Sequence, residues 1–109
     1  MEISGYRYMW IIAMFDLPTD TPQARKNYAF FRKKLLEDGF SMMQYSVYIR
    51  HCHSYENTAV HVKRIKAALP PAGEVCILRI TDKQFELMET FWGRKRKKTL
   101  PAPAQLELF

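Results

Sequence analysis

The feature that most constrains this fold is an unbroken apolar run near the N-terminus, YMWIIAMF at residues 8–15. The run has the length of a β-strand, is rich in aromatic and branched side chains, and is broken by Asp16-Leu17-Pro18. It is therefore predicted to be a buried central strand of a sheet. The run is far shorter than the roughly 20 residues of a membrane-spanning helix, and Arg7 without a small-residue cleavage site after it argues against a signal peptide. We expect a cytoplasmic protein with no membrane partner.

Two amphipathic helices are predicted after this strand. Thr21 provides the N-cap of the first helix, Pro22 lies in its first turn, and Gly39 ends it. Its apolar positions recur at helical spacing: Ala24, Tyr28, Phe31 and Leu35. Ser54 caps the second helix, which Pro70-Pro71 end. The apolar stripe of the second helix is Ala59, Val62, Ile65 and Leu69.

The segment from 40 to 50 alternates like a strand, with Tyr45, Val47 and Ile49 on one face. It contains no Gly or Asn-Gly turn, so the pattern alone predicts one long strand, and two strands would need a tight reversal near residues 44–46. Residues 74–80 form the next predicted strand. Thr81-Asp82 then begin a short helix that continues through residue 91 or 92 and stops at Gly93.

The order of these elements predicts an α+β two-layer sandwich of the ferredoxin-like βαββαβ type, with helices on one face of an antiparallel sheet. The chain of 109 residues has room for one such domain, expected over residues 1–92. Residues 93–109 are expected to form a basic linker and a terminal strand. The residues of that strand alternate polar and apolar: Gln105, Leu106, Glu107, Leu108 and Phe109. This strand suits pairing with a sheet edge of another subunit, and a frayed tail is the alternative.

The positive charge of the chain is concentrated in one segment. The net charge is +6, and five basic residues stand together as Arg94, Lys95, Arg96, Lys97 and Lys98. The rest of the chain is nearly neutral. Such a cluster indicates a polyanionic partner, with a solvated linker as the alternative. Arg25 and Lys26 lie on the polar face of the first helix, which is usually solvated but can also meet phosphates.

Asp16 is the leading candidate for chemistry because it ends the buried first strand. In a split βαββαβ sheet the end of the second strand and the start of the third lie at the same edge as the end of the first. Gln44, Ser46 and Arg25 are therefore expected near Asp16. Asp82 and residues 51–53 are expected at the opposite edge.

One carboxylate per chain is fewer than metal-dependent nucleases usually use. Mg²⁺, however, keeps most of its waters and needs only one or two protein carboxylates. A symmetric dimer would supply a second copy of Asp16 near its two-fold axis. The alternative is that Asp16 is a turn or cap residue before Pro18.

Other metal and nucleotide sites have less support. In the segment His51-Cys52-His53 at most the two histidines share a side of a strand, whereas a structural zinc site needs four ligands. Cys52 and Cys76 are read as reduced thiols and His61 as a surface or packing residue. Nucleotide-binding and zinc-protease motifs do not occur. The pattern of an RNA-recognition domain is met only by Gly39-Phe40.

The ordered set of motifs resembles CRISPR-associated protein two over most of the chain, most of all the versions that accompany single-effector, RNA-guided nuclease systems. The residues that carry the resemblance are Arg7-Tyr8-Met9, Met14-Phe15-Asp16-Leu17-Pro18, Arg25-Lys26, Gly39-Phe40, Gln44-Tyr45-Ser46-Val47-Tyr48 and Thr81-Asp82-Lys83-Gln84-Phe85. The basic run at 94–98 departs from simpler members. DNA contacts are therefore not carried over to that run residue by residue.

The resemblance implies a homodimer that bridges dimers of the integrase, CRISPR-associated protein one, and captures duplex spacer DNA. It also implies Mg²⁺-dependent nuclease activity on RNA or DNA, with Asp16 as catalytic residue and metal ligand and with Ser46, in the segment that includes Tyr48, as a second candidate catalytic residue. It favours two strands within residues 40–50. We expect the scaffold role to dominate, because no clear general base lies beside Asp16 in the sequence. A non-enzymatic RNA-binding module or a stand-alone ribonuclease is the alternative.

Overall fold

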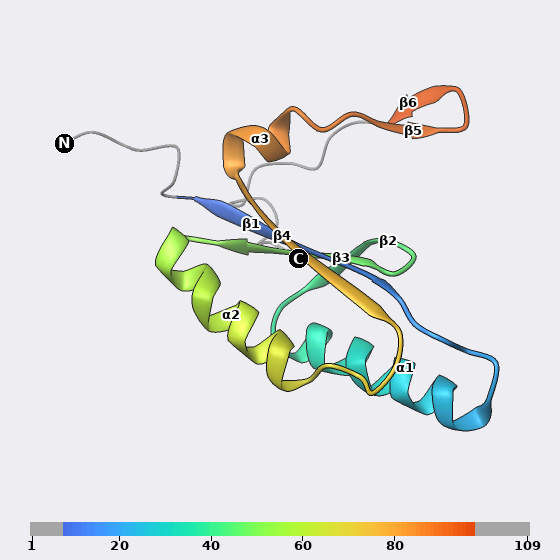
Figure 1. The fold of residues 1–109 in the computed structure, drawn as a ribbon. Coiled ribbons are helices and arrows are strands. Elements are labelled where there is room, and N and C mark those ends of the chain that lie inside the picture. The colour runs from blue at the N-terminus through green and yellow to red at the C-terminus, as the bar shows by residue number, and fades with distance from the viewer. Residues whose placement is uncertain (1–7, 98–109) are drawn as a thin grey trace.

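A computed structural model describes residues 8–97 of the chain and confirms the ferredoxin-like α+β fold (Figure 1). The βαββαβ elements are β1 (Met9–Asp16), α1 (Pro22–Glu37), β2 (Ser41–Gln44), β3 (Val47–Cys52), α2 (Tyr55–Ala67) and β4 (Glu74–Thr81). They are followed by α3 (Asp82–Glu86), β5 (Thr90–Trp92) and β6 (Lys95–Lys97). The antiparallel sheet has the order β2-β3-β1-β4. Helices α1 and α2 cover one face, and α3 lies on the other (Figure 1).

The helices begin where the sequence predicts because each has a side-chain cap. The Thr21 hydroxyl accepts a hydrogen bond from the Ala24 amide at 3.0 Å, and the Ser54 hydroxyl accepts one from the Asn57 amide at 2.9 Å. Thr81 and Gln84 form a reciprocal capping box at the start of α3. Within residues 8–97, no helix is long and apolar enough to cross a membrane.

The apolar run of β1 is buried on both faces of the sheet. Its alternate residues Ile11 and Ala13 are 0% exposed and pack with the inner faces of α1 and α2. The intervening residues Trp10 and Ile12 belong to a second cluster, in which Phe85 of α3 stacks on Trp10 with ring centroids 3.9 Å apart. The predicted central strand is confirmed.

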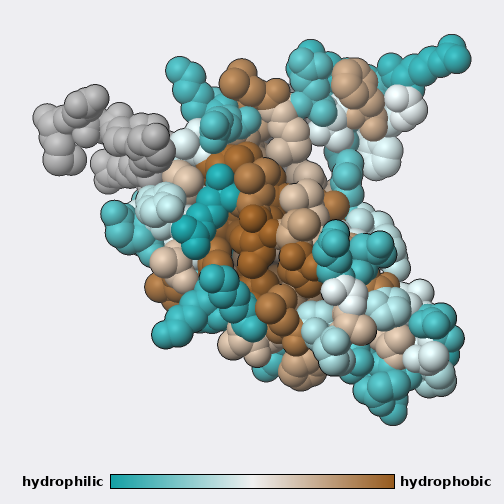
Figure 2. Space-filling view, viewed as in Figure 1, coloured by the Kyte–Doolittle hydropathy of each residue, from teal (hydrophilic) through white to brown (hydrophobic). Residues whose placement is uncertain are grey.

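The second face of the sheet is only partly covered. Met14 and Leu78 lie on this face, beyond the reach of α3, and are 37% and 46% exposed. Figure 2 shows hydrophobic side chains gathered over the middle of the surface in view, with hydrophilic ones around them. This end of the sheet therefore carries an open apolar surface.

Residues 40–50 form two strands, so the reversal that the resemblance favours is confirmed and the single strand predicted from alternation is wrong. Tyr45 and Ser46 make the turn between β2 and β3, and Ser46 has a φ of 62°. This left-handed conformation is uncommon for a residue other than glycine, which is why the sequence gives no turn signal. The Phe15 amide donates to the Ser46 carbonyl at 3.0 Å and holds the turn against the end of β1.

The segment after β4 also differs from the prediction. Helix α3 ends at Glu86, and Phe91 and Trp92 lie in β5 rather than in a helix. β5 pairs with β6, so residues 95–97 of the basic run form a strand and not a linker. The β-branched and aromatic residues of β5 favour a strand, and Gly93, with a φ of 54°, permits the tight reversal. Lys98 and residues 105–109 lie outside the described residues, as does the predicted terminal strand.

The buried face of α2 is partly polar, which the predicted stripe did not include. Ala59 and Leu69 are exposed, whereas Thr58 and His61 are buried with Val62 and Ile65. The buried polar groups have partners. The Thr58 hydroxyl donates to the Tyr55 carbonyl at 2.5 Å, and His61 contacts the carboxylate of Asp38, the C-cap residue of α1.

Candidate functional site

Asp16 is an exposed carboxylate at the end of the buried strand β1, as predicted. The strand register places Glu74 of β4 directly opposite it. Opposed residues of antiparallel strands lie on the same face with their Cβ atoms about 4.5–5.5 Å apart. Two exposed carboxylates, Asp16 and Glu74, therefore stand side by side in one chain. Like charges in this position repel each other, and a bound cation relieves that repulsion.

A glycine fixes the approach of the two chain segments at this site. Gly73 precedes Glu74 and has a φ of 94°, which L side chains rarely adopt. A Cβ atom at this position would lie 2.8 Å from the Asp16 carbonyl oxygen and 2.7 Å from a methyl carbon of Leu17. The close packing of Gly73 against the end of β1 thus sets the position of both carboxylates.

Ser46 lies at the same end of β1, but its hydroxyl faces the helical side. It shares a hydrogen bond of 2.9 Å with the Tyr28 hydroxyl of α1. Tyr28 packs edge-on against Phe15, which faces the helices, whereas strand alternation turns Asp16 to the opposite face. The structure thus brings Ser46 and Asp16 to one edge from the two sides of the sheet. Gln44 lies across β3 from this end of β1, paired with Val47, which in turn pairs with Met14.

Two exposed cationic side chains lie near the start of α1, on the helical side of the sheet. Arg25 is exposed and donates through Nη1 to the Thr19 carbonyl at 3.1 Å, and Lys26 beside it is exposed. One helical turn further along from Tyr28, Arg32 donates to the Tyr48 hydroxyl at 2.6 Å. These side chains lie on the side of the sheet opposite to the one that Asp16 faces.

A groove of about 370 Å³ separates the β2–β3 turn from the β5–β6 hairpin. Its lining combines methionine and aromatic side chains with Gln44 and Lys97: Met42, Met43, Gln44, Tyr45, Phe85, Met88, Thr90, Phe91, Trp92 and Lys97. The Lys97 ammonium lies over the Trp92 ring, 4.4 Å from its centroid. Arg94, Lys95 and Arg96 are exposed on the same hairpin. Residues 95–97 of the predicted cationic segment therefore form a paired strand, with Lys97 at the rim of this groove.

The other titratable candidates lie at the far end of β1. Asp82 accepts a hydrogen bond from the Trp10 indole at 2.6 Å, and the His51 ring packs edge-on against Trp10. Cys52 is in the core, where burial raises the pKa of its thiol. Across residues 8–97, no group of three or more His, Cys, Asp and Glu side chains could hold a metal ion.

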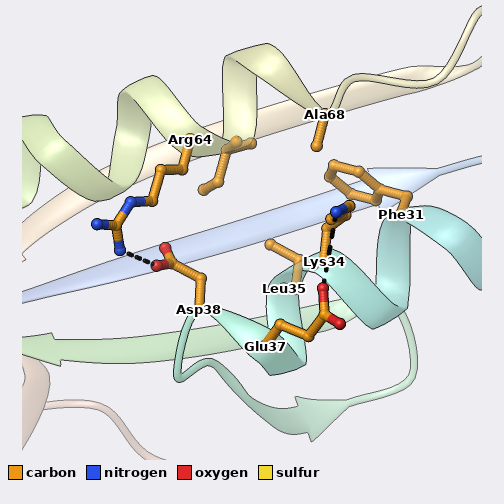
Figure 3. A pocket seen from close by; sticks show the side chains of 8 residues that line it. Phe31, Lys34, Leu35, Glu37, Asp38, Arg64 and Ala68 are labelled. Carbon is orange, nitrogen blue, oxygen red and sulfur yellow. Dashed lines mark hydrogen bonds and ion pairs between the residues drawn. The ribbon is translucent and has the colours of Figure 1, made fainter.

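A second polar cluster, between the helices, was missed by sequence reasoning. Asp38, after the last turn of α1, contacts His61 Nδ1 at 2.8 Å and Arg64 Nη1 at 2.5 Å. Figure 3 shows Arg64 reaching from α2 to Asp38 beside a cavity of about 280 Å³. Arg50 also donates to the Asp38 carbonyl at 2.7 Å. These contacts join α1, α2 and β3, so this cluster is structural.

Comparison with known proteins identifies the family. A family model described as "CRISPR associated protein Cas2" matches residues 9–88. The chain belongs to the Cas2 family. The match extends from the start of β1 to just beyond α3 and so includes Asp16 and Glu74.

Two relatives named "CRISPR-associated endoribonuclease Cas2" are similar over nearly the whole chain. The protein of Parvibaculum lavamentivorans is 64% identical over 93% of this chain and 100% of its own length. That of Flavobacterium psychrophilum is 53% identical over 99% of this chain and 94% of its own. A solved structure described as "Crystal structure of cas2" superposes with a TM-score of 0.54 at 18% identity, covering 87% of this chain and 94% of that one. This likeness supports the fold.

We predict that Gly73→Ala lowers the free energy of unfolding by about 1–3 kcal/mol, because it combines a strained φ with a clash at Asp16 and Leu17. Gly93→Ala is the matched control, since Gly93 also has a positive φ but its added Cβ would meet nothing within 4 Å. Urea unfolding of both variants measures the difference. Equal losses would contradict the role given to the close approach at Gly73.

Proposed function

We propose that this Cas2 chain is a cytoplasmic, homodimeric subunit of the complex that acquires spacers in a CRISPR system of the single-effector type. In this role it bridges dimers of CRISPR-associated protein one, the integrase, and holds duplex DNA by its phosphates. We also propose that it is a Mg²⁺-dependent endonuclease acting on RNA or DNA at Asp16. The observation that carries the proposal is the exposed carboxylate pair Asp16 and Glu74 at the end of β1.

The residues at the end of β1 fit a hydrated magnesium ion. Asp16 and Glu74 offer oxygen ligands of the kind that Mg²⁺ prefers, and their exposure leaves room for the waters that this ion retains. When bound, Mg²⁺ neutralises charge on a phosphodiester and lowers the pKa of a coordinated water. Asp16 and Glu74 would hold the ion, while Arg25 and Lys26 would attract the phosphate backbone.

The open apolar surface supports a homodimer. Asp16 lies on the same face of the sheet as the exposed Met14, at the partly uncovered end. An isologous interface that covers Met14 and Leu78 would bring two copies of the carboxylate pair toward one two-fold axis. Residues 105–109 are proposed to add a strand to the partner's sheet edge or to the integrase.

Duplex DNA is proposed to bind at the exposed cations of the β5–β6 hairpin and α1: Arg94, Lys95, Arg96, Lys97, Arg25 and Lys26, together with Lys98. Lysine and arginine side chains that reach phosphates position a duplex without reading its bases. This matches a protein that must accept many different sequences as spacers.

A scaffold role without chemistry is the second candidate, and the placement of the histidines favours it. His61 is bonded to Asp38, and His51 lies at the far end of β1 beside Trp10. His53 follows the last residue of β3, Cys52, which pairs with Met9 at the same far end of β1. None of the three histidines is placed to act as a general base at Asp16. We therefore propose that DNA capture is the main biological role and that hydrolysis accompanies it. The catalytic role proposed for Ser46 is limited to positioning, since Tyr28 occupies its hydroxyl.

Asp16→Ala should abolish Mg²⁺-dependent cleavage of RNA and DNA while leaving spacer integration with the partner integrase nearly intact. The substitution removes a metal ligand but retains the cationic surface. Asp20→Ala is the control, because Asp20 is an exposed aspartate in the loop after β1 and its replacement changes the net charge equally. Cleavage is measured with end-labelled strands and integration with a supercoiled target.

Full cleavage by Asp16→Ala would refute the enzyme proposal. Loss of both activities in a folded protein would instead assign Asp16 to DNA capture.

Replacing all five basic residues at 94–98 with Gln should weaken duplex binding to a similar extent for unrelated sequences. Each phosphate neutralised contributes about 0.9 to the slope of log affinity against log salt, so five contacts account for roughly 4.5 units. Fluorescence anisotropy of labelled duplexes at several salt concentrations gives the slope. Lys63→Gln with Lys66→Gln, on the exposed face of α2, is the control for loss of charge elsewhere. An unchanged slope would exclude these residues from DNA binding.

A further inference from the structure

Tyr45 presents an aromatic ring to solvent at the tip of the β2–β3 turn. Its exposed fraction is 76%, the largest among the exposed large hydrophobic side chains of the described residues. A side chain of this kind usually lies flat on its own surface or packs in the core. Tyr45 instead stacks on a second ring, that of Tyr28, with centroids 6.0 Å apart and planes inclined by 19°.

The ring of Tyr45 is held in place from behind. Tyr28 is fixed by its hydrogen bond to Ser46 and by its edge-on contact with Phe15. Ser46 is fixed in turn by the hydrogen bond from the Phe15 amide. One face of Tyr45 is therefore covered by a braced partner, while most of the ring remains open. A pre-positioned aromatic surface loses little conformational freedom when a flat ligand stacks on it.

The position of this ring connects the carboxylate site with the groove. The neighbouring residue Ser46 is bonded to Phe15, which directly precedes Asp16. Tyr45 also lines the groove whose opposite wall contains Phe91, Trp92 and Lys97. In Figure 1 the β2–β3 turn lies between α1 and the β5–β6 hairpin. Tyr45 thus adjoins both the turn bonded to the end of β1 and the groove lined by these rings and Lys97.

The chemistry of this surface fits a single-stranded nucleic acid. Proteins bind single strands with aromatic rings on which bases stack and with cations that follow the phosphates. Phe91 and Trp92 are 53% and 66% exposed, and Arg94, Lys95 and Arg96 are exposed beside them. The neighbouring Tyr28 hydroxyl raises the pKa of the Tyr45 phenol above its ordinary value.

We propose that Tyr45, braced by Tyr28, is a positioning residue that stacks a base of a single-stranded nucleic acid and sets the strand across the Asp16 edge. This inference rests on the proposed nuclease function and adds a determinant of its substrate class. Bases within a duplex are already stacked on each other and cannot lie on the ring, so the contact distinguishes single strands from the duplex that the cationic hairpin holds.

The test is a binding measurement in EDTA, which separates strand binding from metal and cleavage. Fluorescence anisotropy is measured with a labelled 12-nucleotide RNA, the DNA of the same sequence, and the corresponding DNA duplex. Replacing an aromatic ring that stacks on a base costs about 1–3 kcal/mol, so Tyr45→Ala should bind single strands roughly 5- to 150-fold more weakly. Tyr45→Phe keeps the ring and should retain most of the affinity. Duplex affinity should not change.

Tyr55→Ala is the matched control, because Tyr55 is an exposed tyrosine, 47% accessible, at the start of α2 and outside the groove. A loss of affinity in Tyr45→Ala for the single-stranded RNA alone, or for both the single-stranded RNA and the single-stranded DNA, would support the stacking role and identify the kind of strand bound. Equal losses for duplex and single strands, or an effect of Tyr55→Ala as large as that of Tyr45→Ala, would overturn it.

Unchanged single-strand affinity in Tyr45→Ala would overturn the inference and leave the proposed function intact. Failure of the unmodified protein to bind any strand or duplex at low salt would overturn both. Sedimentation of each variant tests whether Tyr45 instead belongs to an interface between subunits. If Tyr45→Ala changes the mass of the assembly, the ring belongs to a subunit interface and the inference is wrong.

Discussion

The structure depends on the central position of β1, which is paired along both edges and buried on both faces. Its pairing with β3 and β4 fixes the sheet order, and its consecutive residues Ile11 and Ile12, which point to opposite faces, enter the two separate core clusters. Fully burying one such side chain contributes about 1.5–3 kcal/mol. A strand paired along both edges is a firm support, and Asp16 is the exposed carboxylate at its end. The candidate site therefore takes its precision from the most buried element of the fold.

The turn at Ser46 links this support to the helical layer. A non-glycine residue in the left-handed region costs of order 1–3 kcal/mol and persists only where its surroundings hold it. Here the holding contacts are the Phe15 amide and the Tyr28 hydroxyl. The same turn places Tyr45 against Tyr28 of α1, where the two rings stack. The strained turn is thus held by contacts with both β1 and α1.

Structural features that depend on residues close together in the sequence could be predicted from it. Contacts that depend on the register between strands far apart in the chain could not. Thr21 and Ser54 predict the starts of their helices because capping involves residues close together in the sequence. Asp16 is recognisable as a candidate site residue because it follows an apolar run. Glu74 becomes part of the site only through its pairing with Asp16, which depends on the register of strands far apart in the chain. The pairing of Asp38 with His61 is equally non-local. The β5–β6 hairpin was missed because the basic residues of β6 resemble a solvated linker more than a strand.

The central claim is that Asp16 and Glu74 form a metal site at the end of β1, and paramagnetic relaxation tests it most directly. Mn²⁺, which prefers the same oxygen ligands as Mg²⁺, is added in small amounts to isotope-labelled protein, and Mg²⁺ is used to compete. The account predicts that amide signals of Asp16, Glu74 and Gly73 broaden first and recover with Mg²⁺, and that Asp16→Asn removes the effect. Signals around Asp82, at the far end of β1, serve as the internal control. Broadening that is centred there, or that persists in Asp16→Asn, would contradict the account.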